Sequence, residues 1–285
     1  MALTDHPRQE PIAHDANDRL VRKRRRRWPW IVLGVVVVLV GAGTVLWQSA
    51  SRAHQVSLQQ AKRQAGALSG MAGSGRPAPG VYRYVGSGTE QLSLPPLSQT
   101  EGPTIPVTVR LEGSDCFIFR VDYSSHHWQT WEYCRHGTDL WELGGQQWQL
   151  WSIGPVNVTS SGTVTCTNTM ALATHPSLGQ VWSADCSGTN SAVSGTIFSR
   201  GTYRFLGDVT LRIGGTSVRC AHYLRLRTNS GAQQGTEHSD VWFDLANGLP
   251  VRMVQQLHAT TQTSFGRTTY GQSGEFTAAS VRPSA

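Results

Sequence analysis

Four side chains between residues 126 and 136 have the chemistry to bind a metal: His126, His127, Cys134 and His136. Imidazole and thiolate are common zinc ligands in proteins. The spacing of these four residues is irregular, and a cysteine outside the cytoplasm is more often oxidised than metal-bound. The segment therefore predicts polar loop residues and a disulfide, and we expect no metal and no cofactor.

The sequence contains none of the common catalytic motifs. It has no Gly-x-Ser-x-Gly turn, no His-Glu-x-x-His helix and no glycine-rich phosphate loop followed by Lys-Ser or Lys-Thr. Glu132 and Glu142 fall on neighbouring predicted strands, where two facing carboxylates could act as acid and base. Residues 76–285 contain 14 arginines and 14 acidic residues, which favours a solvated surface of mixed charge. We expect no enzymatic activity.

Aromatic residues are concentrated between positions 128 and 151. Tryptophan stacks on sugars, lines apolar pockets and pairs well across strands. Two interpretations stay open: a binding wall for a lipid or glycan, or the core and rim of a twisted sheet. The candidate wall residues are Trp128, Trp131, Trp141, Trp148 and Trp151.

Residues 80–285 show the alternation that is typical of antiparallel strands. Val107, Val109 and Leu111, for example, would share one face of a strand. No helical period of ten or more residues occurs beyond residue 80. We expect a mainly β fold, in which one antiparallel sheet forms a curved half-barrel, a barrel or a sandwich.

Two glycine-containing turns predict β-hairpins. The first is Gly144-Gly145, which would place Trp141 directly opposite Trp148. The second is Asn247-Gly248, within residues 241–254.

The cysteines predict two disulfides and one free thiol. If residues 116–123 and 127–134 are antiparallel neighbours, facing positions sum to 250, so Cys116 meets Cys134. That register also puts the aromatic residues of both strands on one face. The second pair, Cys166 with Cys186, rests only on closing the Gly- and Ser-rich segment between them. Cys220 would remain as a buried thiol.

A basic cluster precedes a long apolar run. The cluster consists of Arg22, Lys23, Arg24, Arg25, Arg26 and Arg27, and residues 28–48 carry no charge. A bilayer core requires about 20 apolar residues in a helix, and basic flanks stay in the cytoplasm. We expect a transmembrane helix at 28–48 behind a disordered cytoplasmic tail at 1–27. Cleavage as an export signal is the alternative, because small residues follow the run.

The net charge of +7 is located near this predicted span. Residues 1–75 carry 11 basic and 4 acidic side chains, and the remainder of the chain is neutral. The cations therefore predict anionic lipid headgroups, rather than nucleic acid, as the partner. Residues 49–79 predict a juxtamembrane helix and a flexible linker, and residues 80–285 an extracytoplasmic β domain.

Three segments carry a family resemblance: residues 213–218, "DVWFDLANGLPVRM" at 240–253 and "GEFTAAS" at 274–280. They resemble exported actinobacterial proteins that have a single span or a lipid anchor. The Trp-x-Asp…Gly-Leu-Pro element is also similar to a strand pair in lipoprotein carriers of the LolA and LppX type. That resemblance implies a curved, half-open antiparallel sheet around a hydrophobic ligand cavity.

Together these features predict a membrane-anchored, non-catalytic extracytoplasmic β domain that binds a hydrophobic small molecule or lipid. The alternative is a cell-envelope module that binds another protein and has a filled core without a ligand cavity. A continuous apolar cavity of several hundred Å³ would favour the first interpretation.

Overall fold

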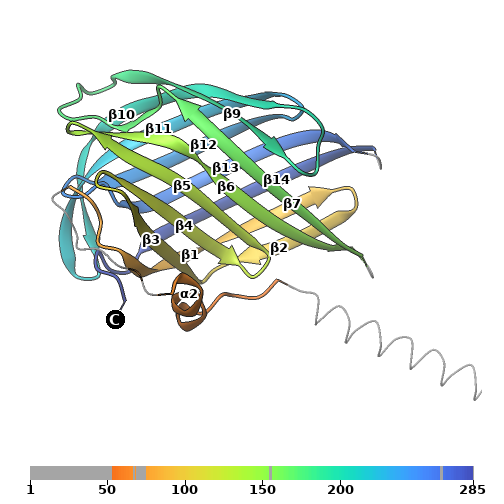
Figure 1. The fold of residues 1–285 in the computed structure, drawn as a ribbon, viewed down its shortest axis with the longest axis horizontal. Coiled ribbons are helices and arrows are strands. Elements are labelled where there is room, and N and C mark those ends of the chain that lie inside the picture. The colour runs from red at the N-terminus through yellow and green to blue at the C-terminus, as the bar shows by residue number, and fades with distance from the viewer. Residues whose placement is uncertain (1–52, 67, 69–74, 154–155, 264–265, 285) are drawn as a thin grey trace, which may run out of the picture. The chain divides into compact units, whose positions relative to one another are not determined.

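The computed structural model describes residues 53–66, 68, 75–153, 156–263 and 266–284. Strands that follow one another in the chain pair in order, and the last strand pairs with the first, so the sheet closes into a barrel (Figure 1). The strands are β1 (Gly80–Ser93), β2 (Pro96–Glu101), β3 (Thr104–Glu112), β4 (Cys116–Ser124), β5 (His127–His136), β6 (Asp139–Ile153), β7 (Val156–Thr167), β8 (Met170–Leu172), β9 (Val181–Asn190), β10 (Ile197–Ile213), β11 (Thr216–Gly231), β12 (Gln234–Asp244), β13 (Pro250–Thr263) and β14 (Gly266–Ala278).

Twelve strands form the wall of the barrel. β2 and β3 pair with β1 in one continuous register and act as a single strand interrupted at Gly102-Pro103. Gly102 has φ +81°, and a Cβ there would lie 2.0 Å from the carbonyl oxygen of Gly86, so the interruption requires glycine. β8 pairs only with β6. The mainly β prediction is confirmed, and the sheet is closed rather than half-open.

One end of the barrel interior is filled with apolar and aromatic side chains. The alternation of each strand places one residue in two inside, where it packs against the opposite wall. Val107 and Val109 are fully buried there, and Leu111 packs against the same cluster, so the three share one face as predicted. Among the described residues, the largest fully buried side chains are Tyr82, Tyr84, Ile105, Phe117, Phe119, Tyr123, Leu140, Tyr203, Ile213, Tyr223, Phe243 and Leu249.

The predicted pairing of β4 with β5 is confirmed. Cys116 lies opposite Cys134, and Phe119 lies opposite Trp131. The disulfides Cys116–Cys134 and Cys166–Cys186 are both present, and Cys220 is a buried free thiol. The cysteine assignment from the sequence therefore holds.

The predicted turn at Asn247-Gly248 is confirmed, and the one at Gly144-Gly145 is wrong. Gly248 has φ +78° in the connection between β12 and β13. Gly144 and Gly145 instead lie inside β6, where the register with β5 shifts. A Cβ on Gly145 would lie 2.0 Å from the carbonyl oxygen of Thr130, so these glycines accommodate a β-bulge and close strand packing.

The bulge separates the two tryptophans of the predicted pair. Trp141 lies opposite Cys134, and Trp148 lies opposite Trp128. Two glycines between alternating residues are compatible with a turn or with a bulge, and here the neighbouring strands select the bulge.

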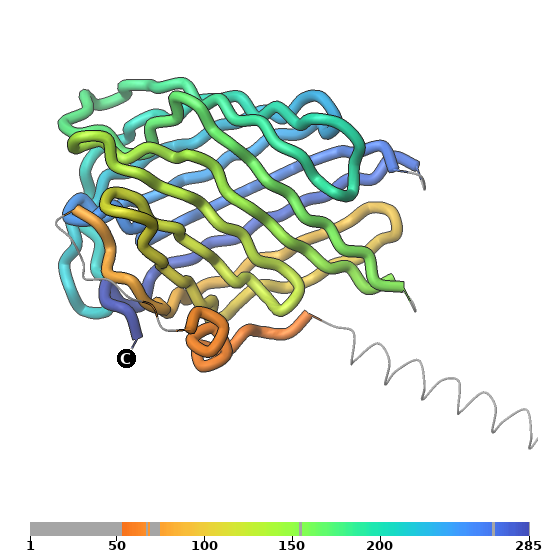
Figure 2. Tube along the Cα trace, viewed as in Figure 1, coloured from red at the N-terminus to blue at the C-terminus, as the bar shows by residue number. Residues whose placement is uncertain are grey.

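A short helix, α2 (Leu58–Ala65), lies against the outside of the barrel (Figure 2). Ser57 caps it by accepting a hydrogen bond from the Gln60 amide at 3.1 Å. Ala61 is buried against Val81 of β1, and the His54 amide donates to Ser125 Oγ at 3.0 Å. The segment predicted as juxtamembrane helix thus contains a helix that packs on the barrel.

The predicted cytoplasmic tail at 1–27 and the predicted span at 28–48 lie outside the described residues. Within the described part of the chain, no helix has the length and apolar character needed to cross a bilayer.

Candidate ligand-binding site

A cavity of about 300 Å³ occupies the barrel interior at the end opposite the aromatic core. Its mouth lies beside the turns that join β1 to β2 and β11 to β12 and beside the end of β13, because Leu94, Gln233 and Thr263 line it. His127, Arg227 and Gln272 line its deeper part, and His127 and Arg227 are buried next to the packed core. The cavity is therefore a cup with a charged floor.

The cup wall mixes uncharged polar groups with apolar ones. The carboxamides come from Gln129, Gln147, Gln149, Asn190, Asn229 and Gln233, with hydroxyls from Ser160, Ser199, Thr261 and Thr268. Leu92, Ile153, Ile197 and Leu257 supply aliphatic surface. Trp151 and Tyr270 both line the cavity, and their rings pack edge to face with centroids 6.4 Å apart. A wall of this kind suits a ligand that has both an apolar surface and hydrogen-bonding groups.

One side of the floor is an ion-pair network on β6, β11 and β12. Arg227 Nη2 donates to Glu142 Oε2 at 2.8 Å, and Tyr203 donates to the same oxygen at 2.5 Å. Arg225 donates to Glu237, which also accepts from Ser239 Oγ at 2.9 Å. Burial raises the pKa of Glu237, but attraction by both arginines more than offsets this effect and lowers it overall. The negative charges of two carboxylates thus balance the positive charges of two guanidinium groups inside the barrel.

The other side of the floor joins His127 to two carboxyl groups of β1 and β2. His127 Nδ1 hydrogen-bonds Glu90 and lies 3.6 Å from Glu101 Oε1. Gln149 donates to Glu90 at 2.9 Å, and Gln272 donates to Glu101 at 2.8 Å. These bonds fix the positions of both acids.

Glu90 and Glu101, which both lie beside His127, have pKa values shifted in opposite directions. Burial lowers the pKa of His127, but the charge of Glu90 and hydrogen bonds to both carboxyls raise it to about 9 overall. Burial raises the pKa of Glu90, but His127 lowers it overall. Burial raises the pKa of Glu101 to about 7. An ionised Glu90–His127 pair therefore lies beside an acid that keeps its proton to a higher pH than Glu90 does.

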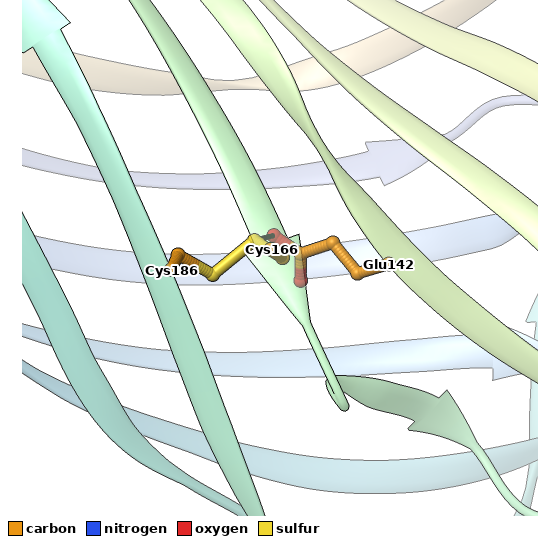
Figure 3. Close-up of side chains that lie close together, drawn as sticks. All are labelled: Glu142, Cys166 and Cys186. Atoms are coloured by element: carbon orange, nitrogen blue, oxygen red, sulfur yellow. Dashed lines mark hydrogen bonds between the residues drawn. A yellow bond between two sulfur atoms is a disulfide. The ribbon is translucent and has the colours of Figure 1, made fainter.

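Among the residues that the structure describes, two groups of side chains bring together atoms that could ligate a metal. In the first, Glu90, Glu101 and His127 have ligand atoms within 4.8 Å of one another, but the imidazolium of His127 already supplies the positive charge between the acids. In the second, Glu142 lies beside Cys166 and Cys186 (Figure 3). These sulfurs form a disulfide, so they offer no thiolate, and the 3.8 Å approach of Cys166 Sγ to Glu142 is a contact without a donated proton.

The structure divides the five candidate wall tryptophans between the two faces of the sheet. Trp151 lines the cavity, whereas Trp131 is buried in the aromatic core. Trp128 lies on the outer face with Arg120 at 4.2 Å from its ring centroid. Trp141 and Trp148 also point to the outer face of the sheet, and both are half-buried. One tryptophan of the five therefore reaches the cavity.

The candidate acids and metal ligands are also separated. Glu132 lies opposite Gly144 and lines an outer groove, whereas Glu142 is buried inside. Cys134 is in a disulfide, and His136 contacts Trp141. Of these residues, Glu142 belongs to the floor network, as does His127.

The sequence interpretation missed the buried arginines. Arg225 and Arg227 follow the buried Tyr223 at alternate positions, so their phase along β11 already pointed inward. The same alternation places Glu237 and Ser239 on the face of β12 that points into the barrel. The signal was present in the strand pattern, but charged residues are usually assigned to the solvent face.

A second hollow, of about 820 Å³, lies on the outer surface between α2 and the strands β3 to β7. Arg110, Arg120, Asp122 and Glu132 line it together with Trp128.

Comparison of the chain with protein-family models, with curated proteins and with solved structures finds no match. The resemblance to exported actinobacterial proteins and to lipoprotein carriers stays a prediction.

Proposed function

We propose that this protein is a membrane-anchored, extracytoplasmic binding protein whose barrel holds one small amphiphilic molecule. The observation that carries the proposal is the cup: a cavity of about 300 Å³ with a charged floor, amide and hydroxyl walls and apolar surface towards its mouth. Such a site lies at the lower limit of small-molecule pockets, about 300–1,000 Å³. It suits a compact ligand better than a long acyl chain.

The sequence predicts a hydrophobic ligand, and the composition of the wall restricts this class to ligands that also carry hydrogen-bonding groups. Carboxamides buried without partners are costly, so a purely apolar ligand would leave Gln129 and Gln147 unsatisfied wherever it displaced water. An amphiphile hydrogen-bonds these groups and covers Leu92 and Leu257 at the same time. A protein-binding module needs no such cavity, which makes it the weaker proposal.

The location rests on the sequence. The uncharged run at 28–48 behind the basic cluster at 22–27 supports a retained anchor with the barrel outside the cytoplasm. Two disulfides in the barrel agree with an oxidising compartment.

Titration with an uncharged fluorescent amphiphile, N-phenyl-1-naphthylamine, tests the proposal. The full chain in lipid nanodiscs is compared with Ser199→Trp, which fills the cup from β10, and with Thr228→Trp on the outer face of β11. We expect saturable one-site binding by the native and Thr228→Trp proteins, and only lipid background with Ser199→Trp. Equal signals from all three proteins would refute binding in the cup.

A further inference from the structure

Arg227 has unused hydrogen-bonding capacity at the floor of the cup. A guanidinium group carries five N–H donors. Arg227 lines the cavity at 8% exposure, yet Nη2 alone makes a hydrogen bond within the described part of the chain, to Glu142. Its Nε atom is sealed from solvent without a partner among the described residues, whereas Nη1, which makes no hydrogen bond there either, stays accessible to solvent. An unpaired donor on a buried charged group is costly, which points to a ligand atom that completes it.

Glu237 supplies an acceptor beside this donor. It lies directly opposite Arg227 in the β11–β12 register and also lines the cavity. Its Oε1 atom accepts from Arg225 and from Ser239, whereas Oε2 accepts no hydrogen bond from the described residues. The side chain is 18% exposed, so this carboxylate opens to the cup.

On the β6–β11–β12 side of the floor, where Arg227 and Glu237 lie, the charge balance determines which head group fits. Arg225 and Arg227 are compensated by Glu142 and Glu237 through contacts of 2.8–3.9 Å and the Arg225–Glu237 bond. An ionised ligand head would bring an uncompensated charge into this buried site, where the loss of hydration disfavours it. A neutral head group uses the same donor and acceptor without that penalty.

We infer that the cup recognises a ligand with a neutral head group that offers an acceptor oxygen beside an N–H donor, as a primary amide does. The carbonyl oxygen accepts from Arg227, and the N–H donates to Glu237. The apolar part of the ligand then extends past Trp151 and Tyr270 towards the mouth. This inference rests on the proposed function of the cup and specifies its ligand class.

Competition against bound N-phenyl-1-naphthylamine tests the inference with three probes that share a six-carbon chain. These are hexanamide, hexanoate and hexylammonium, which carry a neutral, an anionic and a cationic head. On the native full chain, we expect hexanamide to compete at least tenfold better than either ion. This order is measured on the native protein, so it does not depend on whether any variant folds.

Two variants shift the charge of the floor in opposite directions. Glu237→Gln leaves the floor with one excess positive charge, so hexanoate should gain relative to hexanamide. Arg227→Gln leaves one excess negative charge, so hexylammonium should gain. Arg204→Gln, an exposed arginine of β10, is the matched control and should keep the native order.

The outcomes separate this inference from the proposed function. If hexanoate competes best on the native protein, or if all three probes compete equally, the neutral-head inference is overturned while the cup still binds. If the native chain does not bind N-phenyl-1-naphthylamine above background, the binding function is overturned, and the inference with it.

Discussion

His127 and Glu90 form a buried hydrogen-bonded pair inside the barrel, and Glu101 lies 3.6 Å from the same imidazole nitrogen. All three side chains are at most 4% exposed. The pair links β5 to β1 at the floor of the cup, so its protonation affects both the stability of the barrel and the charge of the cup floor.

This group predicts that stability falls as the pH rises from about 4.5 to about 9. Burial raises the pKa of Glu101 from 4.5 to about 7, so the native state binds more protons than the unfolded state between these values. The expected loss is about 3 kcal/mol, at 1.4 kcal/mol for each pKa unit. The contribution of His127 is complete below its ordinary pKa of 6.5 and is lost as the pH rises through about 9. Urea unfolding across this range measures the slope.

Glu101→Gln isolates the first part of that dependence. The amide mimics the protonated acid, so the variant should match the native protein near pH 5 and exceed its stability at pH 8. His127 titrates in both proteins, so the slope above pH 7 should persist. An unchanged slope between pH 4.5 and 7 would assign the dependence to other groups.

Glu142→Gln should destabilise the barrel by about 3–5 kcal/mol, because it leaves buried Arg227 and Arg225 without their shared carboxylate. The matched control is Glu132→Gln on the outer face of the adjacent strand, which should change stability by less than about 0.5 kcal/mol. Chemical denaturation at pH 7 compares the two variants. Similar losses for both would contradict the assignment of Glu142 to the interior.

Trp131→Ala should cost about 3–5 kcal/mol, because the ring is buried against Phe119 in the core. Trp141→Ala should cost about 1 kcal/mol, because its ring is half-buried on the outer face. Thermal unfolding of both variants measures the difference. A larger loss for Trp141→Ala would reverse the assigned faces.

Non-reducing peptide mapping should recover Cys116 linked to Cys134 and Cys166 linked to Cys186. Closing loops of this length stabilises a protein by roughly 3 kcal/mol, so the Cys116→Ala, Cys134→Ala double variant should lose about that much. Cys220 should resist alkylation at pH 8 until the barrel unfolds. Burial, and to a lesser extent repulsion from Asp244, raises the pKa of its thiol to about 12. Rapid alkylation of the folded protein would contradict the buried position.

A reporter that works only in the cytoplasm should be inactive when fused after Ala285. The basic cluster at 22–27 motivates this orientation. Replacement of Arg24, Arg25, Arg26 and Arg27 by neutral residues should produce a mixture of orientations and partial reporter activity. Full activity of the unmodified fusion would show that the barrel is cytoplasmic.

The sequence alone determined the strand class, the β4–β5 register and the cysteine pairing, because these depend on local alternation and on residues close in the chain. Cys116 and Cys134 are 18 residues apart, and a short turn joins their strands. The sequence could not determine closure of the sheet, because β1 and β14 pair across the whole domain, with Tyr84 opposite Ala278. Nor could it decide whether Gly144-Gly145 forms a turn or a bulge, since only the neighbouring strands select between the two. The cup also required the tertiary structure: Glu142, Arg227 and Glu237 lie far apart in the sequence and meet because closure turns their strand faces towards one interior.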